Sequence, residues 1–136
     1  MSEQTQTTTQ EFKRQIAYKC SIGELNKGIF IKKTGWDSSF VMTNYGDFSR
    51  VNLIAVVVGK DENSLILDDG TGKINGRFFE NAEQELEKID IGDLILIIGR
   101  PREFNNEIYI TPEIIKKIHN KVWIMYRRKE LTLIKK

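Results

Sequence analysis

The chain of 136 residues has one cysteine, one histidine and two prolines. A single thiol, Cys20, cannot form an internal disulfide, which is consistent with a reducing compartment. Cys20 and His119 are too few ligands for a zinc site, and nothing nearby in the sequence supports them as a nucleophile and base. We therefore expect a protein that is not an enzyme and that holds no metal and no cofactor.

Long apolar segments are also absent. No run approaches the roughly 20 apolar residues that span a bilayer. Residues 1–10 are polar and rich in Thr and Gln, so they lack the apolar core of a signal peptide and are expected to form a disordered tail. The hydrophobic content of 40% and the charged content of 29% are typical of a soluble globular domain.

The net charge of +2 conceals a strong asymmetry along the chain. Residues 116–136 contain eight Lys or Arg and one acid, Glu130, which gives this segment a charge of +7. The rest of the chain has thirteen basic and eighteen acidic residues, a charge of −5. A general polyanion binder would be basic throughout. Any site for a polyanion must therefore be local.

Residues 65–79 carry the most informative pattern. An apolar run reaches Asp68-Asp69-Gly70-Thr71-Gly72, and an alternating segment leaves it. Asp-Gly between two β-like runs predicts a hairpin, and the two acids suit a tight turn better than a metal site. The alternation places on one face Lys73, Asn75, Arg77 and Phe79, and on the other Ile74, Gly76 and Phe78. A cationic face with an aromatic ring suits single-stranded nucleic acid, which is anionic and has flat bases.

The order of elements predicts the fold class. Strands are expected at 51–58, 64–67, 73–79, 94–98 and 108–111, with a helix at 80–88. Gly99-Arg100-Pro101 is expected to break the fourth strand, and Pro112 to end the fifth or mark an edge. Three strands, a helix and two strands are the order of an OB-fold, a five-stranded, partly open Greek-key barrel. We assign this all-β domain with helices to residues 49–119.

Two further segments flank the predicted barrel. Residues 11–48 are expected to form an N-terminal extension packed on the barrel, with the capping-box spacing of Ser21 and Glu24 starting a short helix before Gly28. Residues 120–136 are expected to form a basic amphipathic helix with Asn120 as N-cap. Its apolar residues either cover the barrel or bind a partner protein, and the partner-binding set is Val122, Trp123, Met125, Tyr126 and Leu133.

The basic residues of this last helix also have two interpretations. Arg127, Arg128 and Lys129 either lie on its solvent face or contact DNA or an acidic partner. The sequence leaves both open.

Residues 49–119 resemble the OB-fold of the middle subunit of replication protein A and its relatives, including archaeal replication-protein-A-associated proteins and the Stn1 family. The resemblance rests on the strand 50–58, the hairpin 67–74, Arg77 with Phe79, Gly92-Asp93, and Gly99 to Phe104. It implies a single-stranded-DNA-binding subunit of a replication-protein-A-like complex in DNA replication or repair, with a cytoplasmic, nucleoid-associated location, or a nuclear one in a eukaryote. In this family a C-terminal helix commonly mediates assembly with another subunit.

The candidate site follows from the alternation of side chains along residues 73–79 together with this resemblance. We expect bases to stack on the aromatic residues Phe79, Phe104 and Tyr109. The DNA backbone would be held by four basic residues, Lys73, Arg77, Arg100 and Arg102. Two alternatives remain open: an assembly subunit with little nucleic-acid affinity of its own, and an RNA-binding OB module.

Overall fold

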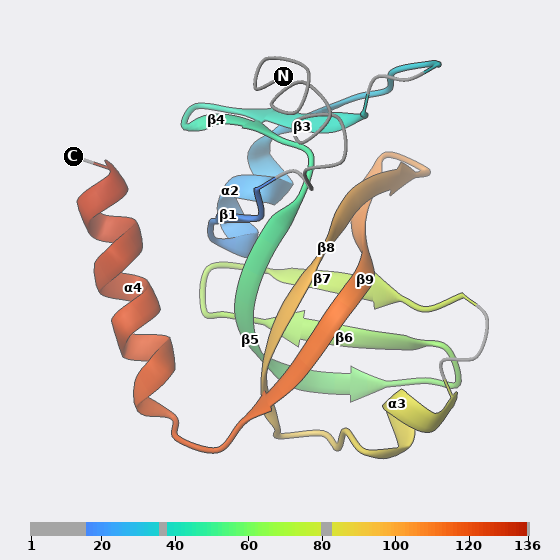
Figure 1. Ribbon diagram of the computed structural model, residues 1–136, viewed down its shortest axis with the longest axis vertical. Coiled ribbons are helices and arrows are strands. Elements are labelled where there is room, and N and C mark those ends of the chain that lie inside the picture. The colour runs from blue at the N-terminus through green and yellow to red at the C-terminus, as the bar shows by residue number, and fades with distance from the viewer. Residues whose placement is uncertain (1–15, 36–37, 80–82, 136) are drawn as a thin grey trace, which may run out of the picture.

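The computed structural model describes residues 16–35, 38–79 and 83–135 (Figure 1). The predicted disordered tail at residues 1–10 lies outside the described residues. Six strands form the main sheet in the order β1-β5-β6-β7-β9-β8, in which the short β1 (Tyr18–Lys19) runs parallel to β5, and pairing of β5 with β8 closes the other five into a barrel. Their bounds are β5 Val51–Lys60, β6 Ser64–Asp68, β7 Lys73–Arg77, β8 Leu94–Phe104 and β9 Glu107–Ile118. The predicted OB-fold barrel is confirmed.

The barrel interior is built by the alternation predicted for its hairpin. Along β7 the residues Ile74 and Gly76 are buried, while Lys73 is exposed and Asn75 and Arg77 are half-buried on the outer face. Inward residues of the neighbouring strands are fully buried, among them Leu53, Leu65, Leu67, Ile95, Ile97 and Ile110. Each such side chain contributes roughly 1.5–3 kcal/mol of hydrophobic stabilisation. The short helix α3 (Glu83–Glu87) lies between β7 and β8, as the OB-fold order requires, and its Leu86 joins this core.

Strands β8 and β9 are much longer than predicted. They pair from Leu94 with Ile118 to Phe104 with Glu107, and the ladder shifts register at Gly99 instead of ending there. A side chain at Gly99 would collide with the backbone oxygen of Thr111, so glycine permits a close approach of the two strands. Pro112 is tolerated because the described pairs of β7 with β9 stop at Ile110, which leaves Pro112 with a neighbour on one side. The predicted break at 99–101 was therefore wrong, and of the two alternatives for Pro112 the residue marks an edge and does not end the strand.

The N-terminal residues form β1 (Tyr18–Lys19), α2 (Ile22–Lys27), and a separate antiparallel sheet in the order β2-β3-β4. The strands of this small sheet are β2 Ile29–Ile31, β3 Phe40–Thr43 and β4 Gly46–Phe48. Figure 1 shows the sheet above one end of the barrel, with α2 between them. The hydroxyl of Ser21 accepts a hydrogen bond from the backbone N–H of Glu24, as the capping-box spacing predicts.

The Asp68-Asp69-Gly70 turn fastens this extension to the barrel. The Asp68 carboxylate accepts from the backbone N–H of Gly70 at 2.7 Å, a hydrogen bond within the turn. Asp69 is turned to α2, where its Oδ2 accepts from the backbone N–H of Ile22 at 2.9 Å. A carboxylate at the first turn of a helix satisfies an otherwise unpaired donor and favours the helix dipole. The motif that predicted a hairpin therefore also docks α2.

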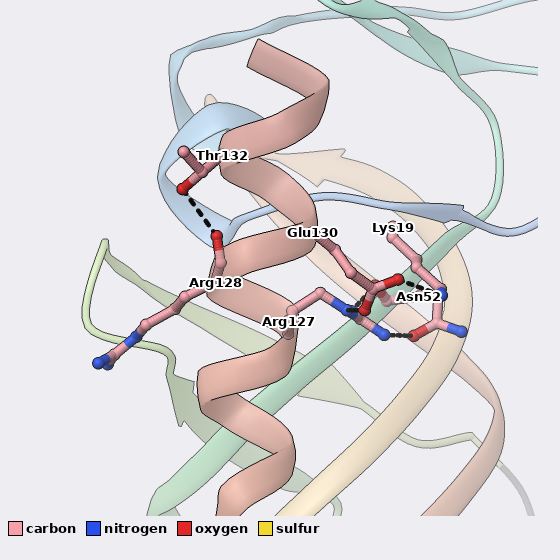
Figure 2. A network of polar contacts seen from close by, with 6 residues as sticks. All are labelled: Lys19, Asn52, Arg127, Arg128, Glu130 and Thr132. Atoms are coloured by element: carbon pink, nitrogen blue, oxygen red, sulfur yellow. Dashed lines mark hydrogen bonds and ion pairs between the residues drawn. The ribbon is translucent and has the colours of Figure 1, made fainter. Parts of the chain in front are cut away.

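The C-terminal helix α4 (Val122–Lys135) is attached to β5 by polar contacts (Figure 2). Arg127 donates from Nη1 to the backbone oxygen of Asn52 and from Nη2 to its side-chain oxygen, both at 2.7 Å. Lys19 of β1 pairs with Glu130 at 2.7 Å. Arg127 is only 5% exposed, so the expectation that it lies on a solvent face or contacts DNA or a partner was wrong. None of the described helices is long and apolar enough to cross a membrane.

Candidate nucleic-acid interface

The candidate interface is the outer face of β7, β8 and β9. Because β7 and β9 run parallel with Asn75 opposite Tyr109, and β8 pairs Arg102 with Tyr109, side chains from three strands meet there. We call these outward residues the binding face: Lys73, Asn75, Arg77, Arg102, Phe104 and Tyr109. Residues far apart in the sequence thus share one surface.

Arg77 forms the centre of the binding face. Its guanidinium lies 4.5 Å from the centroid of the Tyr109 ring and 5.7 Å from that of the Phe104 ring. These are cation–π distances, and such contacts hold the cation in place without neutralising its charge. Phe104 remains 57% exposed. The arrangement presents a flat apolar ring beside a fixed positive charge, which is suited to a base and its phosphate.

The four predicted cations differ in their surroundings. No described carboxylate forms an ion pair with Lys73, Arg77 or Arg102, whereas Arg100 pairs with Glu113 at 3.3 Å. Glu113 also accepts from Arg50 at 2.6 Å. Although partial burial acts to raise the pKa of Glu113, the bonds and charges of these two arginines hold it below its ordinary value. Arg100 therefore has much of its charge balanced within the protein.

Phe79 stands apart from the other predicted rings. It follows the end of β7, where the neighbouring Phe78 N–H donates to the backbone oxygen of Asn63 at 2.8 Å. Phe79 is 61% exposed, and the ring contacts found among the described residues do not include it. Its solvent-facing position leaves it available to a ligand, separate from the Arg77 cluster.

The predicted partner-binding residues of α4 are exposed. Their exposed fractions are 41% for Val122, 53% for Trp123, 59% for Met125, 56% for Tyr126 and 68% for Leu133. The Trp123 and Tyr126 rings meet edge to face, with centroids 5.9 Å apart. We call these five residues the apolar face of α4. Since α4 is attached to β5 through Arg127, this face is left uncovered by the described chain.

The geometry gives no support to nucleophilic or metal chemistry within the described residues. Burial raises the pKa of the Cys20 thiol to about 12, so it is protonated at neutral pH. His119 is exposed. No group of three or more His, Cys, Asp or Glu side chains in the described part of the chain is placed to hold a metal ion.

Some features of this surface were missed from the sequence. The buried Arg127 attaches α4 to β5, and Glu113 forms ion pairs with two arginines. The partners of both residues lie at other places in the chain, so no local sequence pattern indicates these contacts. Asn75 was placed on the cationic face by alternation without being chosen as a site residue. The parallel pairing with Tyr109 is what places it beside the ring cluster.

Comparison with known proteins identifies the domain. The family model of the OB-fold nucleic acid binding domain matches residues 51–118, half of the chain. The chain belongs to this family. The matched segment begins with β5 and ends with β9, so the OB-fold domain contains the whole binding face.

Solved structures confirm the resemblance expected for the OB-fold domain. A chain of a replication protein A heterotrimer bound to single-stranded DNA matches with a TM-score of 0.68 and 15% identity, over 88% of this chain and 94% of that chain. Yeast replication protein A bound to single-stranded DNA matches with a TM-score of 0.64 and 22% identity, over 87% and 88%. The Schizosaccharomyces pombe Stn1–Ten1 complex matches with a TM-score of 0.62 and 12% identity, over 89% and 98%. At these identities the likeness establishes the fold.

A curated relative of the OB-fold domain is an uncharacterized protein of Methanocaldococcus jannaschii. It is 35% identical over 83 residues, which make up 59% of this chain and 35% of that protein. The match therefore spans about a third of the relative's length.

Proposed function

We propose that the protein is a non-catalytic subunit that binds single-stranded DNA on the binding face, within a replication-protein-A-like complex of DNA replication or repair. The observation that carries the proposal is the placement of Arg77 over the Tyr109 and Phe104 rings, with Arg102 on β8 and Lys73 at the start of β7 on the same face and unpaired with described carboxylates. A base stacked on Phe104 would contribute roughly 1–3 kcal/mol. Phe79 would stack a further base at the end of β7.

The phosphates would be held by Lys73, Arg77 and Arg102, with a smaller contribution from Arg100. Three such contacts give modest affinity that decreases as salt increases. This agrees with the charge of −5 outside residues 116–136, which disfavours a broad polyanion surface. The proposal places the protein at the chromosome, in the nucleoid or in a nucleus.

The apolar face of α4 would bind another subunit of the complex. Helix-in-groove association uses apolar residues at i, i+3 and i+4 spacings, as Val122, Met125 and Tyr126 have. Association would remove these side chains and Trp123 from water, and aromatic residues dominate the free energy of such interfaces. The multi-subunit complexes among the structural matches are consistent with this role.

The decisive experiment is a fluorescence-anisotropy titration of a labelled single strand about 20–30 nucleotides long, at low and at physiological salt. We expect Phe104→Ala with Tyr109→Ala to weaken binding at least tenfold, because two stacking surfaces are removed. Tyr45→Ala is the matched control, since Tyr45 is an exposed ring at the β3–β4 turn away from the binding face. Equal effects of the double variant and the control would contradict the proposed site.

The same titration separates two other functions. An RNA strand of equal length that binds more tightly than DNA would indicate an RNA-binding module. An absence of binding at low salt would favour an assembly subunit, which the exposed apolar face of α4 supports independently. In that case Trp123→Glu with Met125→Glu should abolish co-purification with the partner subunit, while changes on the binding face should leave it intact.

A further inference from the structure

A polar cleft opens where β7 and β9 separate. The two strands are paired at Asn75 with Tyr109 and at Gly76 with Ile110, and the described pairs do not extend toward the start of either strand. The gap is a cleft of about 390 Å³. Its wall includes side chains from α2, β7 and the β8–β9 hairpin: Asn26, Lys73, Asn75, Glu103, Asn106 and Glu107.

The cleft shares Lys73 and Asn75 with the binding face, but it adds two carboxylates that the binding face lacks. Glu103 and Glu107 disfavour a phosphate, while Lys73 is the one cation among these six residues. The three asparagine amides each offer both donors and acceptors. The cleft volume lies within the roughly 300–1,000 Å³ of sites that enclose small molecules. An uncharged ligand with a polar edge, such as a nucleobase, fits this lining better than an anion.

Two contacts fix the walls of the cleft before any ligand arrives. Asn26 donates from Nδ2 to the backbone oxygen of Lys73 at 2.9 Å, which holds its amide against the start of β7. Asn105 and Asn106 have φ values of 52° and 64°, the left-handed pair that a two-residue hairpin turn requires. This turn sets the position of Glu107 opposite Phe104. Preorganised groups lose less conformational freedom on binding.

Three residues that line the cleft are direct neighbours of the stacking residues Phe104 and Tyr109. Glu103 precedes Phe104, and Glu107 is the β partner of Phe104 across the hairpin. Asn75 on the opposite wall is the β partner of Tyr109. A strand whose base stacks on the exposed Phe104 ring would therefore bring an adjacent base to the mouth of the cleft.

We propose that this cleft receives one base of the bound strand and selects guanine, an inference that rests on the proposed function. The Watson–Crick edge of guanine presents two adjacent donors, N1–H and N2–H, which one carboxylate accepts together. Cytosine and adenine offer a single amino group on that edge, and thymine offers one N–H between two acceptors. Unstacked bases of single strands expose these edges to protein side chains. Glu103 or Glu107 supplies the carboxylate, and the asparagine amides pair with the remaining polar atoms.

The test compares a labelled oligothymidine of about 20 nucleotides with strands that carry one central dG, dA or dC, by anisotropy at low salt. The strand with dG is expected to bind at least about fivefold more tightly than the others, the lower limit for a two-hydrogen-bond contact to a base. Glu103→Ala with Glu107→Ala should remove this preference without weakening binding of oligothymidine. Asp47→Ala with Glu87→Ala removes the same charge at exposed positions outside the cleft lining and should keep the preference.

The outcomes separate the two proposals. Absence of binding to every strand would overturn the proposed function together with this inference. Binding of oligothymidine without a dG preference would overturn only the guanine site. A preference for another base, or a dG preference that survives in the Glu103/Glu107 double variant, would also overturn the guanine site and leave the proposed function standing. Equal unfolding midpoints of the two double variants would show that a lost preference is not a loss of folding.

Discussion

Replacing Arg77 by alanine should reduce the salt dependence of single-strand binding. Each phosphate neutralised on a single strand contributes about −0.7 to the slope of log K against log salt. The binding face has three cations without a described carboxylate partner, Lys73, Arg77 and Arg102. We therefore expect a slope of about −2 for the wild type, or roughly a 20-fold loss of affinity between about 50 and 200 mM salt. For Arg77→Ala the slope should be about −1.4.

Arg100→Ala is the matched control for this measurement. Both residues are arginines that point outward from neighbouring parts of the barrel, but Glu113 already pairs with Arg100 at 3.3 Å. Removal of Arg100 should therefore change the slope by less than half as much as removal of Arg77. Arg77→Lys separates charge from shape, because it should keep the slope and lose the planar contact with the two rings. The assay is anisotropy titration of one labelled 20-nucleotide strand at several salt concentrations.

Equal changes of slope in Arg77→Ala and Arg100→Ala would refute the argument from charge pairing. A wild-type slope steeper than about −3 would refute it in another way, since three cations cannot release that many counterions. The additional phosphates would then be held by basic residues outside the binding face, of which residues 116–136 carry the largest number.

Three further predictions concern the scaffold. Arg127→Met should lower the free energy of unfolding by about 1–3 kcal/mol, because the partly buried oxygens of Asn52 lose their donors; an unchanged urea midpoint would contradict this. Glu113→Gln should cost about 1 kcal/mol at neutral pH, a value discounted for partial exposure. Because the folded pKa of Glu113 is depressed, this stabilisation is present above its ordinary value of 4.5 and is lost as pH falls through the folded pKa, so wild type and variant should converge in denaturant titrations once the pH is below that folded pKa. Cys20, with a pKa raised by burial to about 12, should resist a thiol reagent at pH 8 until the protein unfolds, and rapid labelling of the native state would count against its burial.

The sequence predicted those features that depend on neighbouring residues. The hairpin at Asp69-Gly70, the alternation along β7 and the Ser21 cap follow from turn chemistry, side-chain period and capping spacing, and all three are present. Gly99 was misleading because a local breaker signal does not reveal the close approach of a neighbouring strand, whereas for Pro112 one of the two predicted alternatives, an edge position, was right. The error shortened β8 and β9 but left the fold class unchanged.

The missing parts of the candidate site depend on contacts between distant segments. Arg77 is brought over Tyr109 and Phe104 by parallel pairing across 34 positions of sequence, which no local period encodes. Likewise, Arg127 is bonded to Asn52, which lies 75 residues away in the sequence. Asp69 accepts a hydrogen bond from α2, which lies 47 residues away. Single residues of this kind have no pattern that distinguishes them from solvent-exposed charges.

The attachment of α4 has a consequence for how such a subunit would move. The helix is joined to β5 by directional hydrogen bonds around Arg127 and Glu130, and its largest apolar side chains point elsewhere. Contacts of this kind can break and re-form while exposing little apolar surface. Water and salt ions therefore compete for these hydrogen bonds and ion pairs more effectively than they disrupt a packed core. We therefore expect α4 to separate from β5 more readily than a helix that is held by apolar packing.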